Sequence, residues 1–369
     1  MLLHDVNNST KNVTININGV NEGRAIVLSI LSTLLILVTI IGNALVVLSI
    51  IIFRSLRTVS NIFITSLAAA DFIMGCFVLP LGAHYVIADK WLLGHTTCHI
   101  WISVDVLSVT ASIGTLSAIA MDRFIATVFP FHYRRKVTRP RTRLAILAIW
   151  SVSFLIAFVP IHAGWWKSTN PIDLACYNDP HCCEFFTNKV YAVLSSLVSF
   201  YIPLIILVTA YSIVFAIAHK LQSTHPHGQE RRTEVVRRAS VAEAIHVFWE
   251  KRQHRAVLMA RIIVGTFVIC WLPFFVLNVT QVFCNRCIDK PVYTAANWLG
   301  YANSFFNPFI YCHSKEFRRA FKKLLRGDLC TQGYRITSRG ALSDANIFNC
   351  SPLTTNSRRN SRWRTSTVI

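Results

Sequence analysis

Seven apolar segments, each long enough to cross a lipid bilayer, constrain this chain more than any other feature of its sequence. A helix needs roughly 20 apolar residues to cross the hydrocarbon core. Segments of that length cover residues 25–53, 61–88, 94–128, 142–163, 190–218, 256–283 and 291–312. The predicted fold class is therefore all-α, a bundle of seven transmembrane helices.

Composition and charge placement agree with a membrane protein. Only 15% of the residues are charged and 53% are hydrophobic, whereas soluble domains carry about 25% charged residues. The net charge of +20 does not indicate nucleic-acid binding, because the basic residues gather in the connections on one side of the membrane. By the positive-inside rule that side is cytoplasmic. We therefore expect a multi-pass plasma-membrane protein with an extracellular N-terminus.

The segments outside the membrane are short. We divide the chain into an extracellular N-terminal segment (1–24), the seven-helix bundle (25–312), an amphipathic eighth helix (313–328) and a disordered cytoplasmic tail (329–369). Asn-x-Ser/Thr sequons predict glycosylation at Asn7, Asn8 and Asn12. A cysteine just beyond the amphipathic helix, Cys330, is a predicted palmitoylation site.

Ionisable residues inside membrane spans are functional candidates, because burying a charge in lipid is costly. Asp105 and Arg123 lie eighteen residues apart in the third span, which is five helical turns. They therefore share one helix face, separated by about 27 Å. A lone carboxylate near the outer third of a span favours a cationic ligand such as a protonated amine. The alternative is a carboxylate that only bonds a neighbouring helix.

The fifth span carries serines that suit the other end of such a ligand. Ser195 and Ser199 are at i and i+4, with Ser196 beside them, and Pro203 allows a local bulge because it lacks a backbone N–H. Together with Asp105, these hydroxyls fit an amine that bears phenolic hydroxyls. The alternative is that the serines bond back to their own helix.

The sixth and seventh spans contribute aromatic side chains around a kinking proline, and polar side chains at helical spacing. These residues are Trp271, Pro273, Phe274, Phe275, Asn278, Asn297 and Tyr301. The aromatic side chains offer a ring-sized apolar slot, and the alternative is an ordinary packed core.

The order and spacing of these motifs resemble a rhodopsin-class (class A) G-protein-coupled receptor over roughly residues 25–330. The motifs are Gly42-Asn43, Leu67 to Asp71, Cys98, Asp122-Arg123-Phe124, Trp150, Pro203, Tyr211, Cys270 to Phe275 and Asn307 to Tyr311. Within that class the chain is most similar to aminergic receptors. The stretches 105–113, 182–188 and 297–304 resemble the β-adrenergic group in particular.

The resemblance implies a receptor for a biogenic amine, with a catecholamine such as adrenaline or noradrenaline as the expected ligand. Octopamine, dopamine and histamine receptors of the Gs-coupled type are the alternatives. The ligand-binding residues that it implies are Asp105, Val106, Phe185, Ser195, Ser196, Ser199, Trp271, Phe274, Phe275, Asn278, Asn297 and Tyr301.

The same resemblance implies activation of Gs and a rise in cAMP, with arrestin and receptor kinases as further partners. The implied activation residues are Asp122, Arg123, Tyr211, Gln253, Asn307, Pro308 and Tyr311. Gln253 is a departure, since this group usually has Glu there and a glutamine cannot form an ion pair. An allosteric sodium ion is implied at Asp71, Ser112, Asn303 and Asn307, where the alternative is a structural water network. We expect no other metal and no cofactor.

Disulfide pairing is open from the cysteine count alone, because six cysteines on the outer side allow fifteen connectivities. The resemblance implies Cys98–Cys183 and Cys176–Cys182, and a third bridge, Cys284–Cys287, would close a small loop. On the inner side, two arginines precede Ser240 and Ser361, a pattern that basophilic kinases recognise. The last four residues, 366–369, resemble a PDZ ligand.

Three other function classes fit the sequence less well. A retinal protein needs a lysine for a Schiff base, and the seventh span, 291–312, has none. An enzyme needs a nucleophile–base or metal set, which these spans do not offer. A transporter or channel would need more polar spans or internal repeats.

Overall fold

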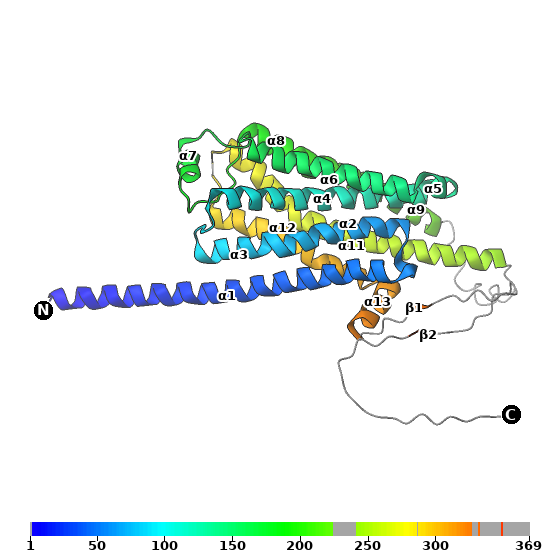
Figure 1. Ribbon diagram of the computed structural model, residues 1–369, viewed down its shortest axis with the longest axis horizontal. Helices are drawn as coiled ribbons and strands as arrows, with labels where there is room; N and C mark the ends of the chain where they lie inside the picture. The colour runs from blue at the N-terminus through cyan, green and yellow to red at the C-terminus, as the bar shows by residue number, and fades with distance from the viewer. Residues whose placement is uncertain (1, 224–240, 286, 327–330, 333–347, 350–369) are drawn as a thin grey trace, which may run out of the picture.

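The computed structural model describes residues 2–223, 241–285, 287–326, 331–332 and 348–349. The backbone alone is described for residues 2–21, 134, 172, 218–223, 241–261, 331–332 and 348–349. The long helices lie alongside one another in one bundle (Figure 1). In chain order the helices are α1 (Leu2–Ile52), α2 (Val59–Ile73), α3 (Leu79–Ala88), α4 (Gly94–Val128), α5 (Pro130–Lys136), α6 (Arg139–His162), α7 (Pro171–Asn178), α8 (Lys189–Ser196), α9 (Ile202–Ser223), α11 (Val241–Phe283), α12 (Lys290–Tyr311) and α13 (Lys315–Arg326).

The predicted spans appear as long apolar helices. Within the described part of the chain, six helical stretches are long and apolar enough to cross a membrane: Glu22–Ile52, Val59–Ala88, Gly94–Val128, Arg139–His162, Lys189–Ile217 and Ile262–Phe283. The seventh predicted span corresponds to α12, a 22-residue helix whose several asparagines make it less apolar. Its polar residues face into the bundle, where Asn303 and Asn307 are almost fully buried.

The N-terminal segment differs from the expected boundary. The structure continues α1 back to Leu2, so helix runs through the predicted segment 1–24 and protrudes past the other helices (Figure 1). The tail differs too. A two-residue antiparallel ladder pairs β1 (Thr331–Gln332) with β2 (Phe348–Asn349), within a region that the sequence predicted to be disordered.

Two helices contain a wider π turn just before a proline. Residues Met74–Val78 form one, between α2 and α3, and residues Leu197–Tyr201 form the other, between α8 and α9. Proline cannot donate the i→i−4 hydrogen bond and its ring clashes with the preceding turn, so a local bulge relieves the strain. The bulge predicted before Pro203 is confirmed.

Side-chain caps mark where two of these helices begin. The Thr58 side chain accepts a hydrogen bond from the Asn61 N–H at the start of α2. The Asn188 side chain does the same for the Tyr191 N–H at the start of α8, at 2.8 Å. Each cap satisfies one backbone donor that the helix itself leaves unpaired.

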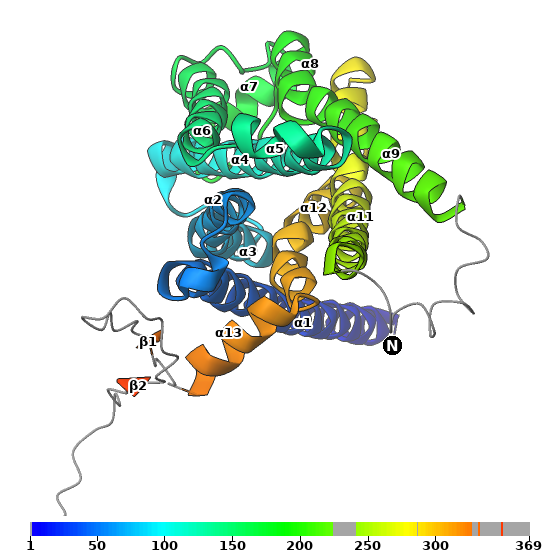
Figure 2. The same ribbon diagram turned by 90° about the vertical axis from the view of Figure 1, so that its right-hand side faces the viewer.

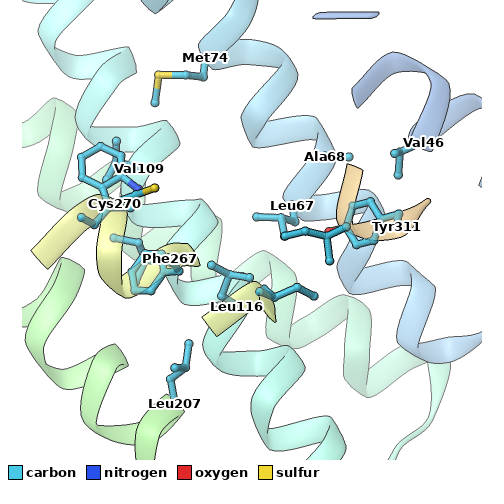
Figure 3. Packing of buried hydrophobic residues seen from close by; sticks show 14 of the residues in the cluster. Val46, Leu67, Ala68, Met74, Val109, Leu116, Leu207, Phe267, Cys270 and Tyr311 are labelled. Carbon is cyan, nitrogen blue, oxygen red and sulfur yellow. The ribbon is translucent and has the colours of Figure 1, made fainter. Parts of the chain in front are cut away.

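Helix α4 occupies the middle of the bundle and packs against α2, α6 and α9, while α11 packs along α12. Figure 3 shows the core that these helices share, where Leu116, Phe267, Leu67 and Tyr311 are almost fully buried. Since lipid is as apolar as these side chains, the core stabilises the bundle through close packing rather than through removal from water. The outward faces carry exposed apolar residues such as Ile205, which is 65% exposed.

The two ends of the bundle differ in chemistry. One end, here called the disulfide end, carries Cys98–Cys183, Cys176–Cys182 and Cys284–Cys287, so all three predicted bridges are confirmed. The opposite end, here called the basic end, carries the turn at residues 54–57, helix α5 and the start of α6. Helix α13 packs against α1 at this end, where the sequence predicted the amphipathic helix 313–328.

Several predicted sites lie outside the described residues or side chains. These are Asn7, Asn8, Asn12, Ser240, Gln253, Cys330, Ser361 and the C-terminal residues 366–369. They stay predictions.

Candidate functional site

A cavity of about 60 Å³ lies between α4, the α8–α9 segment, α11 and α12. It is lined by Asp105, Val106, Val109, Thr110, Phe185, Tyr191, Ser195, Ser196, Ser199, Trp271, Phe274, Phe275, Asn278 and Asn297. The structure thus brings together every predicted ligand-binding residue except Tyr301, which does not line the cavity but bonds Asp105. The cavity with this lining is called the inner cavity below.

Asp105 is the anionic group of the inner cavity. Its Oδ2 accepts a 2.6 Å hydrogen bond from the Tyr301 hydroxyl, which in turn accepts a 3.0 Å bond from the Asn297 amide. Its Oδ1 is buried and has no hydrogen-bond partner. A buried carboxylate oxygen without a donor is costly, so this oxygen is suited to a cationic or hydrogen-bonding partner.

The π turn shapes the opposite wall. It places Ser196 and Ser199 in buried positions beside the half-buried Ser195. Ser199 Oγ accepts a 2.9 Å bond from Thr110, and Ser196 Oγ accepts a 3.2 Å bond from Asn278. Because both serines act as acceptors in these contacts, their own hydroxyl hydrogens remain available to a ligand.

The alternative interpretation, that these serines bond back to their own helix, has little support in the structure. Ser195 donates to the Ala192 carbonyl at 3.4 Å, a long contact. Asn278 is fixed from its other side, where its Oδ1 accepts a 2.9 Å bond from the Tyr293 hydroxyl. The wall is therefore a connected polar surface, in which Tyr293, outside the cavity lining, holds Asn278.

An aromatic floor closes the inner cavity. Trp271 lies edge-on to Tyr301, with ring centroids 6.1 Å apart, and contacts Phe275. Gly300 lies directly against this ring, since a Cβ at that position would stand 2.6 Å from Trp271 atoms. Only glycine allows α12 to approach α11 this closely.

Sequence reasoning missed three residues of the lining. Val109 follows Asp105 by four residues, Thr110 follows Val106 by four, and Tyr191 precedes Ser195 by four, which is about one helical turn in each case. Helical spacing from the predicted residues was a usable signal for all three. The Tyr191 hydroxyl bonds the Ile156 carbonyl at 3.1 Å, which ties this wall to α6.

A larger cavity of about 610 Å³ opens above the inner cavity at the disulfide end. Phe185, from the loop that the Cys98–Cys183 bridge holds, lines both cavities. At the rim, Glu184 accepts a 2.8 Å hydrogen bond from Tyr85 and pairs with Lys290 at 2.9 Å. The loop is thus held over the inner cavity by one disulfide and one ion pair.

The predicted sodium site is a buried polar cluster. Asp71 accepts hydrogen bonds from Asn307 at 2.6 Å, from Ser304 at 2.7 Å and from Ser112 at 3.4 Å. Asn303 is also buried, and Ser304, which the sequence prediction did not include, is a further donor to Asp71. Sodium binding by this cluster stays a prediction.

At the basic end, Asp122 and Arg123 form an ion pair at 2.5 Å. Asp122 also accepts bonds from Ser60 at 2.9 Å and from the Tyr133 hydroxyl at 2.8 Å. Burial, together with the neighbouring Asp122 carboxylate, raises the pKa of Tyr133 above its ordinary value. Beside this cluster the Phe131 side chain is 96% exposed.

The other predicted activation residues lie in the adjoining core. Tyr211 and Tyr311 are buried, and the Tyr311 hydroxyl has no hydrogen-bond partner. Gly42 lies against the ring of Pro308. A Cβ added at Gly42 would stand 2.7 Å from a carbon of the Pro308 ring. This glycine therefore sets the contact between α1 and α12.

Comparison with known proteins identifies this arrangement. Residues 42–311 match the model of the 7 transmembrane receptor (rhodopsin family). The chain belongs to the rhodopsin family of seven-transmembrane receptors. It is therefore a multi-pass membrane receptor of a G-protein-coupled family, and that family is not a class of enzymes.

Curated relatives place the receptor among the aminergic members of the family. It is 36% identical to the D(1B) dopamine receptor of Xenopus laevis over 319 residues, which are 81% of this chain and 70% of that one. It is 36% identical to the Alpha-1A adrenergic receptor of Oryzias latipes over 326 residues (83% and 68%). It is 34% identical to Dopamine receptor 1 of Drosophila melanogaster over 322 residues (81% and 62%). The chain thus spans about two thirds of the length of these relatives.

Proposed function

We propose that this receptor binds a catecholamine and raises cAMP through Gs. The carrying observation is the pairing, across one cavity, of Asp105, which has an unpartnered carboxylate oxygen, with the serine wall of the π turn. An ammonium at one end of a small ligand and ring hydroxyls at the other match these two groups. The names of the relatives, dopamine and adrenergic receptors, support the same class of ligand.

The choice between dopamine and an adrenaline-like ligand depends on Asn297. Its amide lies next to Asp105 through the shared Tyr301 hydroxyl, where it suits a β-hydroxyl beside the ammonium. This contact favours adrenaline or noradrenaline, while two of the three relatives named above favour dopamine. Asn297→Ala separates the two: it should weaken a β-hydroxylated amine more than dopamine.

A ligand in the inner cavity contacts the side chains that line it. Trp271 and the kink at Pro273 lie directly below the ligand position, in the helix that continues toward the basic end. A ligand that favours one of two packings shifts the population toward it. We place the G-protein contact at Arg123, Phe131 and the neighbouring ends of α9 and α11, with the disulfide end extracellular.

The test is a cAMP assay in transfected cells with dopamine, noradrenaline, octopamine and histamine. The proposal expects the two catecholamines to raise cAMP at lower concentrations than octopamine, which has one ring hydroxyl, or histamine, which has none. A response led by histamine or octopamine would contradict the catecholamine assignment. A fall in cAMP that pertussis toxin abolishes would contradict the coupling.

A further inference from the structure

A third cavity, of about 250 Å³, lies at the disulfide end between the first turns of α4 and the chain that connects α6 to α8. It is lined by His95, Cys98, His99, Trp166, Lys167, Cys176, Tyr177, Cys182, Cys183 and Glu184. Of these residues, Glu184 alone also lines the larger cavity at this end, and none lines the inner cavity. The third cavity, here called the α4–α7 cavity, is therefore separate from the proposed amine site.

Covalent and backbone contacts fix the walls of the α4–α7 cavity. Two of the three disulfides lie in its lining, so the loop after α7 is tied both to α4 and to α7 itself. Figure 1 shows α7 beyond the bundle at this end. The backbone of Lys167 is held by an antiparallel bridge to Thr187. A lining fixed in this way loses little conformational freedom when a ligand binds.

The aromatic side chains of the lining use their polar atoms elsewhere. Trp166 Nε1 donates to the Ile161 carbonyl at 3.1 Å. The Tyr177 hydroxyl donates to the Phe186 carbonyl and accepts a 3.0 Å bond from the Ser168 N–H. These two rings therefore offer the cavity their apolar surfaces rather than hydrogen-bonding groups.

Lys167 gives the α4–α7 cavity a fixed positive charge. Across the described side chains no ion pair reaches this half-buried lysine, whose ammonium lies 5.3 Å from the centre of the Tyr177 ring. Glu184, the one carboxylate of the lining, is engaged by Tyr85 at 2.8 Å and by Lys290 at 2.9 Å. The Lys167 ammonium thus has no described counter-ion, and a charge that leaves water without one is costly.

Two histidines add hydrogen-bonding groups to the same cavity. His95 and His99 are four residues apart on α4, so they share the helix face that lines it. Among the described hydrogen bonds, none uses a ring nitrogen of either histidine. An imidazole donates one N–H when neutral and two when charged. The cavity therefore presents one ammonium and two imidazoles to a ligand, with apolar rings at its sides.

We propose that the α4–α7 cavity binds a small aromatic monocarboxylate, with its carboxylate on Lys167 and the two histidines and its ring against Trp166 and Tyr177. Hydrogen bonds between charged donors and a carboxylate are the strong ones. One fixed positive charge suits a monoanion, and about 250 Å³ is below the usual range for drug-sized ligands, which favours a single ring. The site goes beyond the proposed amine function and does not depend on it.

The test is ligand-observed fluorine NMR with the purified full-length receptor and para-fluorobenzoate. The parent should broaden the fluorine signal, and unlabelled benzoate should reverse the broadening. The neutral analogue para-fluorobenzamide should bind far more weakly, because it lacks the charge. K167Q should weaken para-fluorobenzoate binding roughly 10- to 100-fold, and H95Q/H99Q roughly 3- to 10-fold. K167R keeps the charge and should retain most of the binding.

K189Q is the matched control, because Lys189 lines the larger cavity at the same end but not the α4–α7 cavity. It should bind para-fluorobenzoate as the parent does. Thermal unfolding of each variant should match that of the parent, so that a lost signal reports the site rather than the fold.

Four results would overturn the proposal. K167Q could bind para-fluorobenzoate as tightly as the parent, or K189Q could lose as much binding as K167Q. The benzamide could compete as well as the benzoate, which would show that the cavity recognises the ring alone. Chloride could displace the benzoate as effectively as unlabelled benzoate does, which would show a site for an inorganic anion.

Discussion

Single residues decide the chemistry of the inner cavity. The Asp105 Oδ1 is buried without a donor, and Tyr301 holds the other carboxylate oxygen in place. On the opposite wall Ser196 and Ser199 accept bonds from Asn278 and Thr110, so each can still donate one. The cavity thus presents an acceptor at one end and donors at the other.

The first prediction concerns Ser199. Ser199→Ala should weaken dopamine binding by about 0.5–1.5 kcal/mol, the usual contribution of one hydrogen bond, and should barely affect phenethylamine, which has no ring hydroxyl. Competition binding of both amines to parent and variant membranes measures this difference. Ser153→Ala is a matched control, because Ser153 is buried in α6 and bonds only its own helix. Equal losses for the two amines would mean that Ser199 serves packing alone.

A second prediction concerns Tyr301. Tyr301→Phe keeps the ring against Trp271 but removes the hydroxyl that bonds Asp105 Oδ2. Both carboxylate oxygens then lack a fixed donor, so amine affinity should fall about 3- to 10-fold through loss of orientation. Surface expression should stay near that of the parent. An unchanged affinity for every amine tested would show that Tyr301 does not position Asp105.

At the scale of helices, close contacts between elements depend on small residues at defined places. Gly300 lets α12 approach the Trp271 ring on α11. Gly82 on α3 is less closely packed, because a Cβ added there would make an ordinary van der Waals contact with Trp101 at 3.4 Å. The two glycines lie in helices of the same bundle but tolerate a methyl group very differently. They form a natural pair for comparison.

The third prediction uses that pair. Gly300→Ala should destabilise the receptor by about 1–3 kcal/mol, because Trp271 cannot move away without disturbing Phe275 and the cavity floor. Gly82→Ala should be neutral or slightly stabilising, because alanine favours helix. Thermal unfolding of the two purified variants measures both effects. The packing account fails if Gly82→Ala is as harmful as Gly300→Ala.

The sequence predicted helices well, because apolar length and proline position are local properties. The spans, the bulge before Pro203 and the inward face of α4 at Asp105 all follow from spacing along one segment. The bond from Ser304 to Asp71 was not predicted, because it depends on how far α12 is rotated against α2. The bonds from Thr110 to Ser199 and from Tyr293 to Asn278 depend on helix packing in the same way.

At the scale of the whole molecule, the bundle connects two chemically different ends through shared helices. Helix α4 carries Asp105 toward the disulfide end and the Asp122–Arg123 pair at the basic end. Helix α11 carries Trp271 and Phe275 below the cavity and packs against α9 and α12. A ligand that changes the packing around Trp271 therefore acts on helices that also form the basic end.

The central claim is that Asp105 holds the ammonium of an amine inside this bundle. Saturation binding of the most potent amine from the cAMP panel, on membranes with parent or Asp105→Asn receptor at equal surface levels, tests it most directly. The account predicts saturable binding by the parent and a loss of at least about 100-fold in the variant, because a desolvated ion pair broken on one side costs about 3–5 kcal/mol. Equal affinity of parent and variant would contradict the account.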